Sequence, residues 1–425
     1  MKPNIATMSI TSKLCRAVKS YPSKPSSACS SSLPIRLYSS TITTSFNPNP
    51  VSIQMINYAI SLAHSPKSDE SYSQGLLVLE QCHSTQADDD SKAAVLLAMA
   101  TLLSERGRFE EAIEKVRFIQ SLTGSSLAVR VAATEALVGL CLQLGNDDSS
   151  LLLADEGLQL FEDIQIEHLG DPAIKVLDTR AKVVKGLVEL IRGNVESANS
   201  HFEEVQQNDC SIGNVALSYG EFLHGTRKFA KAKELYQQVI KSIPENKDFG
   251  EAHNLNACNM IKEEVLLAGT CALGQLEGHL GNFGDAEEML TTALKEAEEY
   301  CGSHHPKVGV VLTCIALMYR SKAMMERSSS LLIQEGLYRR ALELLEAPPL
   351  ETEGAKLRSD VVALARGGYA EVLIVQQNRR AEGERMKKWA ESAWRNRRLS
   401  LADALEPSES SPNISVIDCR TCRAL

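Results

Sequence analysis

A pattern of small and aromatic residues recurs along this chain at intervals of about 34 residues. In its clearest copy, residues 213–244, Gly220 lies in one apolar stretch, and Ala232 and Tyr236 lie one helical turn apart in the next. Small side chains let two antiparallel helices approach closely, and Pro244 ends the second stretch because proline cannot continue a helix. The pattern therefore predicts consecutive pairs of antiparallel helices.

The same arrangement returns in three further stretches, and once in a degenerate form around Gly145. The small residues at the equivalent positions are Ala100, Gly107, Ala112, Gly186, Ala198, Gly274, Gly281, Ala286 and Ala293. Composition agrees with this pattern, because aromatic residues make up only 5% of the 425 residues and β-sheets are enriched in them. An all-α fold is expected.

The repeated unit resembles the tetratricopeptide repeat, through its small residues at the helix crossing, its large apolar residue and its terminal proline. A later stretch, residues 270–342, is similar to the repeats of kinesin light chains, through His305-Pro306 and a helix that contains Ala316 and Tyr319. The resemblance implies a right-handed α-solenoid of antiparallel helix pairs with about seven units. It also implies that the first helix of each pair lines a concave groove.

The helical repeat domain is predicted to cover residues 51–398. Its last helix is rich in arginine and lysine, as expected of a terminal repeat that faces water. Residues 399–425 are polar and are predicted to be a disordered C-terminal tail. No apolar run approaches the roughly 20 residues of a membrane-spanning helix, so no membrane span is expected.

The first 38 residues contain six basic residues and no acidic one, and they are rich in serine. This composition is typical of an organelle transit peptide. The sequence Arg36-Leu37-Tyr38-Ser39 resembles the site cut by the mitochondrial matrix peptidase, with cleavage between Tyr38 and Ser39. Residues 1–38 are therefore expected to be a disordered leader, and the mature protein is expected in the mitochondrial matrix. A plastid leader has a similar composition, so the plastid is the alternative.

The charge of the chain disfavours general binding to nucleic acids. There are 45 basic and 54 acidic residues, a formal net charge of −9. Cleavage after Tyr38 would remove six basic residues and leave 39 against 54, a net charge of −15. Affinity for nucleic acids depends largely on basic residues that neutralise phosphates, and this body is acidic.

No motif for catalysis or cofactor binding is found in the sequence. It contains no phosphate-binding loop, no His-Glu-x-x-His zinc motif and no nucleophile elbow. One Cys-x-x-Cys pair, Cys419 and Cys422, would supply only two of the four ligands of a structural zinc site. The sequence therefore predicts a protein that is not an enzyme and that has no metal or cofactor.

The expected function is that of a protein–protein interaction scaffold or assembly factor in an organelle. The family resemblance places the partner against inward-facing positions of the first helices. These candidate partner-binding residues are Glu221, His224, Gln275, His279, Thr313 and Arg320. Each could equally be a solvated surface residue. The alternative function is that of an RNA-associated organellar helical-repeat protein, which would use the basic helix at residues 380–395.

Overall fold

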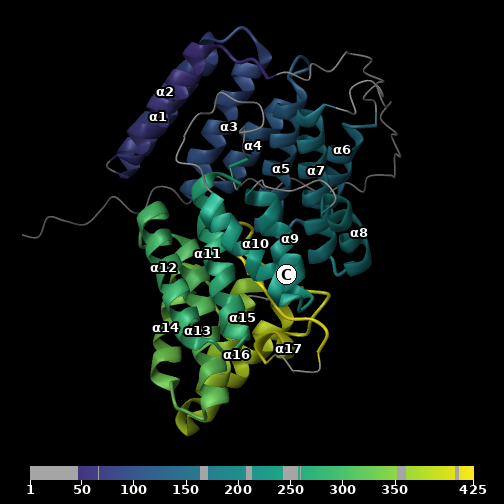
Figure 1. Cartoon of the computed structure of the whole chain (residues 1–425). Helices are drawn as coiled ribbons and strands as arrows, with labels where there is room; N and C mark the ends of the chain where they lie inside the picture. The colour runs from purple at the N-terminus through teal and green to yellow at the C-terminus, as the bar shows by residue number, and fades with distance from the viewer. Residues whose placement is uncertain are drawn as a thin grey trace, which may run out of the picture. The chain divides into compact units, whose positions relative to one another are not determined.

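Eight antiparallel helix pairs make up most of the chain in the computed structural model, which describes residues 46–65, 67–162, 171–206, 213–242, 257–258, 260–351, 360–406 and 411–425 (Figure 1). The first helices of the pairs are α1 (Pro50–His64), α3 (Asp89–Glu105), α5 (Leu127–Gln143), α7 (Pro172–Ile191), α9 (Gly213–Gly225), α11 (Lys262–His279), α13 (Pro306–Glu326) and α15 (Asp360–Val375). The second helices are α2 (Asp69–Thr85), α4 (Phe109–Gln120), α6 (Asp147–Gln159), α8 (Val195–Gln206), α10 (Phe229–Ser242), α12 (Phe283–Cys301), α14 (Leu331–Leu344) and α16 (Arg380–Ala393).

The order of contacts is that of a solenoid. Each first helix packs against its own second helix and against the first helix of the next pair. The expected all-α solenoid is therefore confirmed, with eight pairs among the described residues where about seven were expected.

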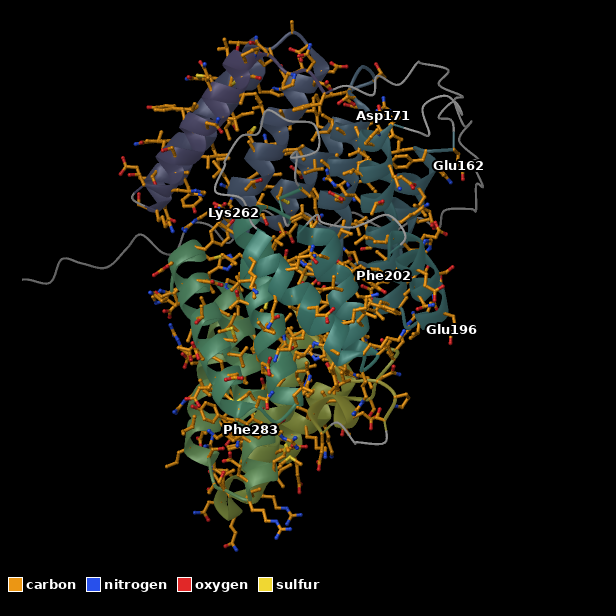
Figure 2. All side chains as sticks on the ribbon, viewed as in Figure 1. Glu162, Asp171, Glu196, Phe202, Lys262 and Phe283 are labelled. Carbon is orange, nitrogen blue, oxygen red and sulfur yellow. The ribbon has the colours of Figure 1, made fainter. Side chains whose placement is uncertain are left out.

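The two helices of a pair cross where a small residue meets a large one 16 positions later. A methyl group added to Gly220 would lie 2.8 Å from the Tyr236 ring, closer than real side chains approach. The same contact joins Gly186 to Phe202, which Figure 2 labels on α8, and Gly274 to Leu290. The predicted small residues of the other crossings, which are Ala100, Ala112, Ala198, Ala232, Ala286, Ala293 and Ala316, have no exposed surface. These contacts place the small residues where the helices of a pair approach each other.

A left-handed glycine lets the chain turn between the helices of several pairs. After α11, Gly281 has a φ of +81°, and the next residue, Asn282, donates its N–H to the carbonyl of Glu277 at 2.9 Å. This is the glycine-dependent turn that commonly ends helices. Gly107, Gly145 and Gly193 form the same turn, whereas Pro244 lies outside the described residues.

The unit similar to kinesin light chains differs from its neighbours in the length of its first helix. Its 21-residue helix α13 continues to Glu326 and ends at Arg327, which has a left-handed φ of +51°. Among the described residues, α13 alone is long and apolar enough to cross a membrane by length and composition, which the sequence pattern did not suggest. It is packed against α11, α12, α14 and α15 within the solenoid. We therefore describe α13 as a core helix.

The predicted disorder of residues 399–425 is wrong wherever the structure describes them. A short helix, α17 (Leu401–Leu405), follows the last pair, and two short strands follow it, β1 (Ile417–Asp418) and β2 (Arg423–Ala424). The strands pair antiparallel, with Ile417 opposite Ala424. Their side chains are buried, and those of Ile417 and Ala424 belong to the same apolar core as residues of helices α5 to α17. The expected leader, with Tyr38 and Ser39, lies outside the described residues.

The helix crossing can be tested with two glycine-to-alanine substitutions. A Cβ at residue 274 would lie 2.7 Å from Cγ of Leu290 and 3.1 Å from its backbone nitrogen, so α11 and α12 would have to separate. We expect Gly274→Ala to lower the free energy of unfolding by about 1–3 kcal/mol, the usual cost of overpacking. Urea denaturation followed by circular dichroism measures the loss.

Gly284→Ala is the matched control, because a Cβ at this position in α12 would have no neighbour within 4 Å. Alanine favours the helix more than glycine does, so this change should be neutral or stabilising by up to about 1 kcal/mol. Equal effects of the two substitutions would show that the crossing is not as tight as described.

Candidate functional site

The six predicted groove residues lie on three consecutive first helices. Glu221 and His224 belong to α9, Gln275 and His279 to α11, and Thr313 and Arg320 to α13. Five of them contact residues outside their own helix. The sixth, Thr313, has no exposed surface, and its hydroxyl donates within α13 to the carbonyl of Gly309 at 2.8 Å. It therefore offers no free hydrogen-bonding group to a partner.

The inner surface of the solenoid is covered by the chain's own last residues. We call residues 411–425 the C-terminal segment, and we call the surface of α9, α11, α13 and α15 along which it lies the groove. In Figure 1 the yellow end of the chain runs beside α9 and α15. Residues 416–421 and 423–425 are at most 2% exposed, which is why a stretch of mixed polarity is ordered.

Arg420 is the first anchor of the C-terminal segment. Its guanidinium has no exposed surface, and its Nη2 forms an ion pair with the carboxylate of Glu221. Its Nη1 donates to the hydroxyl of Ser218 at 3.1 Å, and its Nε lies 3.0 Å from Oδ1 of Asp418 within the segment. Burial raises the pKa of Glu221 well above its ordinary value, although Arg420 acts in the opposite direction. The buried carboxylate thus depends on the arginine as its counterion.

Arg423 is the second anchor and joins two distant parts of the solenoid. Its Nε lies 2.7 Å from Oδ2 of Asp360, the first residue of α15, and its Nη1 lies 2.6 Å from Oδ1 of Asp147, the first residue of α6. The same Nη1 donates to the carbonyl of Leu142 at 3.1 Å. The side chains of Arg423 and Asp360 are at most 1% exposed, and that of Asp147 is 25% exposed. One guanidinium therefore bridges the third and the eighth helix pairs.

The backbone of the C-terminal segment is held by amide side chains. Gln275 accepts the N–H of Ile417 at 2.8 Å and donates to its carbonyl at 2.9 Å, as a neighbouring strand would. Asn396 donates to the carbonyl of Ala424 at 2.7 Å. These bonds use only main-chain groups of the segment, so they do not depend on its side chains.

Arg320 fixes the chain just before the C-terminal segment. Its Nε donates to Glu371 at 2.9 Å, and its Nη1 donates to the carbonyl of Leu405 at the end of α17. A cleft remains open next to this contact, lined among others by His279, Leu317, Ser321, Leu405 and Ser415. The groove is thus only partly filled by the segment.

His224 and His279 meet between α9 and α11. Nε2 of His224 lies 2.8 Å from Nδ1 of His279, and Nδ1 of His224 lies 3.3 Å from the Tyr236 hydroxyl. Burial lowers the pKa of His224 well below its ordinary value, and neighbouring His279 adds to this. Burial and the charge of Arg227 lower the pKa of His279 to about 4. Both imidazoles are therefore neutral near pH 7, and the pair is a structural contact of the groove wall.

The Cys-x-x-Cys pair lies in the turn between β1 and β2. Hydrogen bonding to a neighbouring thiol raises the pKa of Cys271 and Cys419, and burial raises that of Cys314. Burial also raises the pKa of Cys422 to about 11. Because the thiolate is the nucleophilic and metal-binding form, these thiols are unreactive near pH 7. No group of three or more His, Cys, Asp or Glu side chains in the described residues could hold a metal ion.

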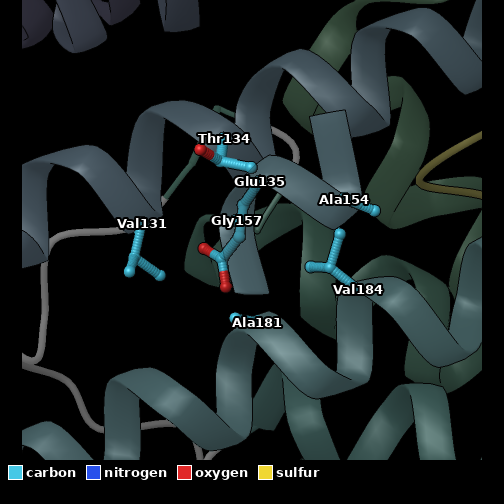
Figure 3. A pocket seen from close by; sticks show the side chains of 7 residues that line it. All are labelled: Val131, Thr134, Glu135, Ala154, Gly157, Ala181 and Val184. Carbon is cyan, nitrogen blue, oxygen red and sulfur yellow. The ribbon is translucent and has the colours of Figure 1, made fainter. Parts of the chain in front are cut away.

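A small cavity between α5, α6 and α7 carries little chemistry (Figure 3). It is lined by Val131, Thr134, Glu135, Ala154, Gly157, Ala181 and Val184. Its one charged group, Glu135, is bound by Arg180, with Nε 3.0 Å from Oε1 and both side chains buried. The cavity lies in the degenerate unit, where Ala154 and Gly157 fill less volume than the large residues of other pairs. A mostly apolar wall with a paired charge has few groups to orient a ligand.

Besides Ser218, four residues that hold the C-terminal segment were missed by the sequence analysis. They are Asp147, Asp360, Asn396 and Arg398, the last of which donates to the carbonyl of Ile414 at 2.8 Å. One available signal was the apolar character of the segment itself, which contains Ile414, Val416, Ile417 and Leu425. Disordered segments are usually poor in such residues.

The neutral state of His279 predicts how stability depends on pH. Its pKa is about 4 in the folded chain and about 6.5 in the unfolded chain, so below pH 6.5 the unfolded chain binds a proton that the folded chain does not. Stability is therefore present above pH 6.5 and is lost as the pH falls toward 4. When the pH is lowered from 7.5 to 5.0, the free energy of unfolding should fall by roughly 2 kcal/mol more in the native chain than in the His279→Asn variant. Denaturant titration at each pH measures both values.

His304→Asn is the control, because His304 is exposed at the entry to α13. It should keep the pH dependence of the native chain. If His279→Asn also kept it in full, the imidazole pair would not be the buried neutral contact described above.

Comparison with known proteins returns only distant structural likenesses. No protein-family model and no curated protein matches the sequence. Among solved structures, the chain is similar to BtubC (BKLC) from P. vanneervenii, with 14% identity, a TM-score of 0.38, and coverage of 57% of this chain and 89% of that chain. It is also similar to the apo form of the quorum sensor NprR from B. thuringiensis, with 10% identity, a TM-score of 0.44, and coverage of 80% and 86%. It is also similar to yeast Tom70, with 12% identity, a TM-score of 0.29, and coverage of 81% of this chain and 92% of that chain.

The chain's own repeats carry the assignment. Small residues at the crossings, large residues 16 positions later and the glycine turns recur in the register expected of tetratricopeptide repeats. The chain is an all-α solenoid of antiparallel helix pairs, and its repeats resemble tetratricopeptide repeats.

Proposed function

We propose that this protein is a non-catalytic interaction scaffold or assembly factor of the mitochondrial matrix, and that its groove binds segments of other proteins. The observation that carries the proposal is the C-terminal segment itself, which lies in the groove as a bound peptide would. Gln275 and Asn396 hold its backbone, and Glu221 and Asp360 hold its arginines. Groove walls that bind main-chain groups and a few charged anchors are typical of peptide-recognition surfaces.

The first arginines of the closing helix are already paired with carboxylates, which disfavours their use in binding RNA. Arg379 on the turn before α16 is paired with Glu335 and Glu382, and Arg380 is paired with Glu384. Basic residues whose charge is already balanced by carboxylates add little affinity for phosphates.

The mitochondrial location rests on the acid-free leader. We expect the protein purified from mitochondria to begin at or near Ser39, because residues 36–39 match the peptidase site. N-terminal sequencing by mass spectrometry measures this. Arg36→Ala should slow the cleavage, with Arg16→Ala as the control that leaves the site intact. An intact Met1, or a reporter with residues 1–60 that accumulates in plastids, would contradict the proposal.

The scaffold function can be tested by photo-cross-linking from within the groove. A photoreactive amino acid at Ser321, which lines the open cleft, should cross-link a partner protein in isolated mitochondria, whether or not ribonuclease is present. Lys295 on α12, whose side chain is 75% exposed away from the groove, is the control position and should give no specific product. Mass spectrometry identifies the products.

Two results would contradict the scaffold proposal. Equal cross-linking from residues 295 and 321 would show that the groove is not the binding surface. Loss of the product on ribonuclease treatment would favour the RNA-associated alternative.

A further inference from the structure

We infer that the groove recognises peptide segments that carry two arginines three residues apart, and that the C-terminal segment is an intramolecular ligand of this class. The inference rests on the proposed function, because it takes the groove as a binding site for protein segments. It goes further by naming the chemistry of the partner and the competitor that the partner must displace.

The charges of the groove wall favour a segment that carries two arginines. Glu221 and Asp360 have no exposed surface, and Asp147 lies beside them at the end of the groove. Their counterions are the guanidinium groups of Arg420 and Arg423, which belong to the C-terminal segment. A buried charge without a partner is strongly unfavourable. Any segment that replaces residues 411–425 must therefore bring two positive charges of its own.

The geometry favours arginine over lysine at both anchors. Arg423 uses Nε toward Asp360 and Nη1 toward Asp147, so its two ends meet two carboxylates at once. Arg420 likewise divides its donors among Asp418, Glu221 and Ser218. A planar fork with five donors makes such divided contacts, whereas an ammonium group acts as a point charge.

The remaining contacts accept different sequences. Gln275 and Asn396 bind main-chain groups, which every peptide has. Val416 and Leu425 have no exposed surface and pack into the apolar core, which sets a requirement for apolar residues on both sides of the arginines. The expected ligand is thus a short hairpin or turn with the pattern Arg-x-x-Arg, flanked by apolar residues.

The C-terminal segment has the advantage of being tethered. A short tether raises the effective concentration of a ligand to about the millimolar range. A partner segment with the same contacts therefore competes at a disadvantage until its own concentration or additional contacts compensate. The open cleft lined by Ser321 and His279 gives a partner room for such additional contacts.

The test separates a bound ligand from a permanent part of the core. A cleavage site for a specific protease replaces residues 407–410 in the full chain, and the folded protein is cut there. A synthetic peptide of residues 411–425 with a fluorophore at its N-terminus is then added. Fluorescence anisotropy follows its exchange with the bound segment, and circular dichroism confirms that the helices stay folded.

We expect saturable exchange in the folded, cut protein and much less binding to the uncut protein. An unlabelled peptide in which both arginines are replaced, Arg420→Ala and Arg423→Ala, should compete at least tenfold more weakly than the native peptide. A peptide with Arg420→Lys and Arg423→Lys is the matched control for charge. It should compete more strongly than the alanine peptide and more weakly than the native peptide.

Three results would overturn the inference. If the cut chain unfolds, or if the peptide enters only when helical structure is lost, the C-terminal segment is a part of the core. If the alanine peptide competes as well as the native one, the arginines do not determine binding. If the uncut protein is a dimer that the peptide dissociates, the segment of a second copy occupies the groove and the intramolecular assignment is wrong.

The outcomes also separate this inference from the proposed function. Peptide exchange without cross-linking at residue 321 would support the arginine-binding site and contradict the mitochondrial scaffold function. Cross-linking at residue 321 without peptide exchange would support the scaffold function and contradict the arginine-binding site.

Discussion

The close crossing of paired helices is the contact on which the rest of this structure depends. In three of the pairs, a glycine of the first helix lies against a large side chain 16 residues later, as Gly220 does against Tyr236. This contact sets the distance between the two helices and the rotation of the first helix about its axis. The rotation in turn decides which residues of the first helix face the groove. Gly220 faces the second helix, so Glu221 and His224 face the groove.

The groove that results is lined by charges that cannot remain unpaired. Taking a carboxylate out of water costs several kcal/mol, which only a close counterion and hydrogen bonds offset. Arg420 supplies both for Glu221, and Arg423 supplies both for Asp360. The C-terminal segment is therefore ordered by the charges of the groove, and the groove can be dry because the segment covers it.

The sequence predicted the local part of this structure and missed the non-local part. Helix pairs and turns follow from residues fewer than about 40 positions apart, and the all-α solenoid was predicted from them. The order of residues 411–425 depends on Asp147, Glu221 and Asp360, which lie up to 276 positions away. No local pattern shows that an arginine such as Arg420 will be buried, because arginine in a polar stretch usually faces water.

The same non-local contacts join helix pairs that are not neighbours in the solenoid. In a simple solenoid each repeat touches only its neighbours, so the curvature is free to vary. Here Arg423 joins α6 to α15, and Tyr300 of α12 donates to Glu105 of α3 at 2.8 Å across 195 residues. The bond between Tyr300 and Glu105 joins two helices directly. The bridge made by Arg423 exists only while the C-terminal segment is in the groove. Occupancy of the groove is therefore coupled to the positions of α6 and α15, in part through this guanidinium. A replacement segment would either rebuild that bridge between Asp147 and Asp360 or let the third and eighth pairs separate.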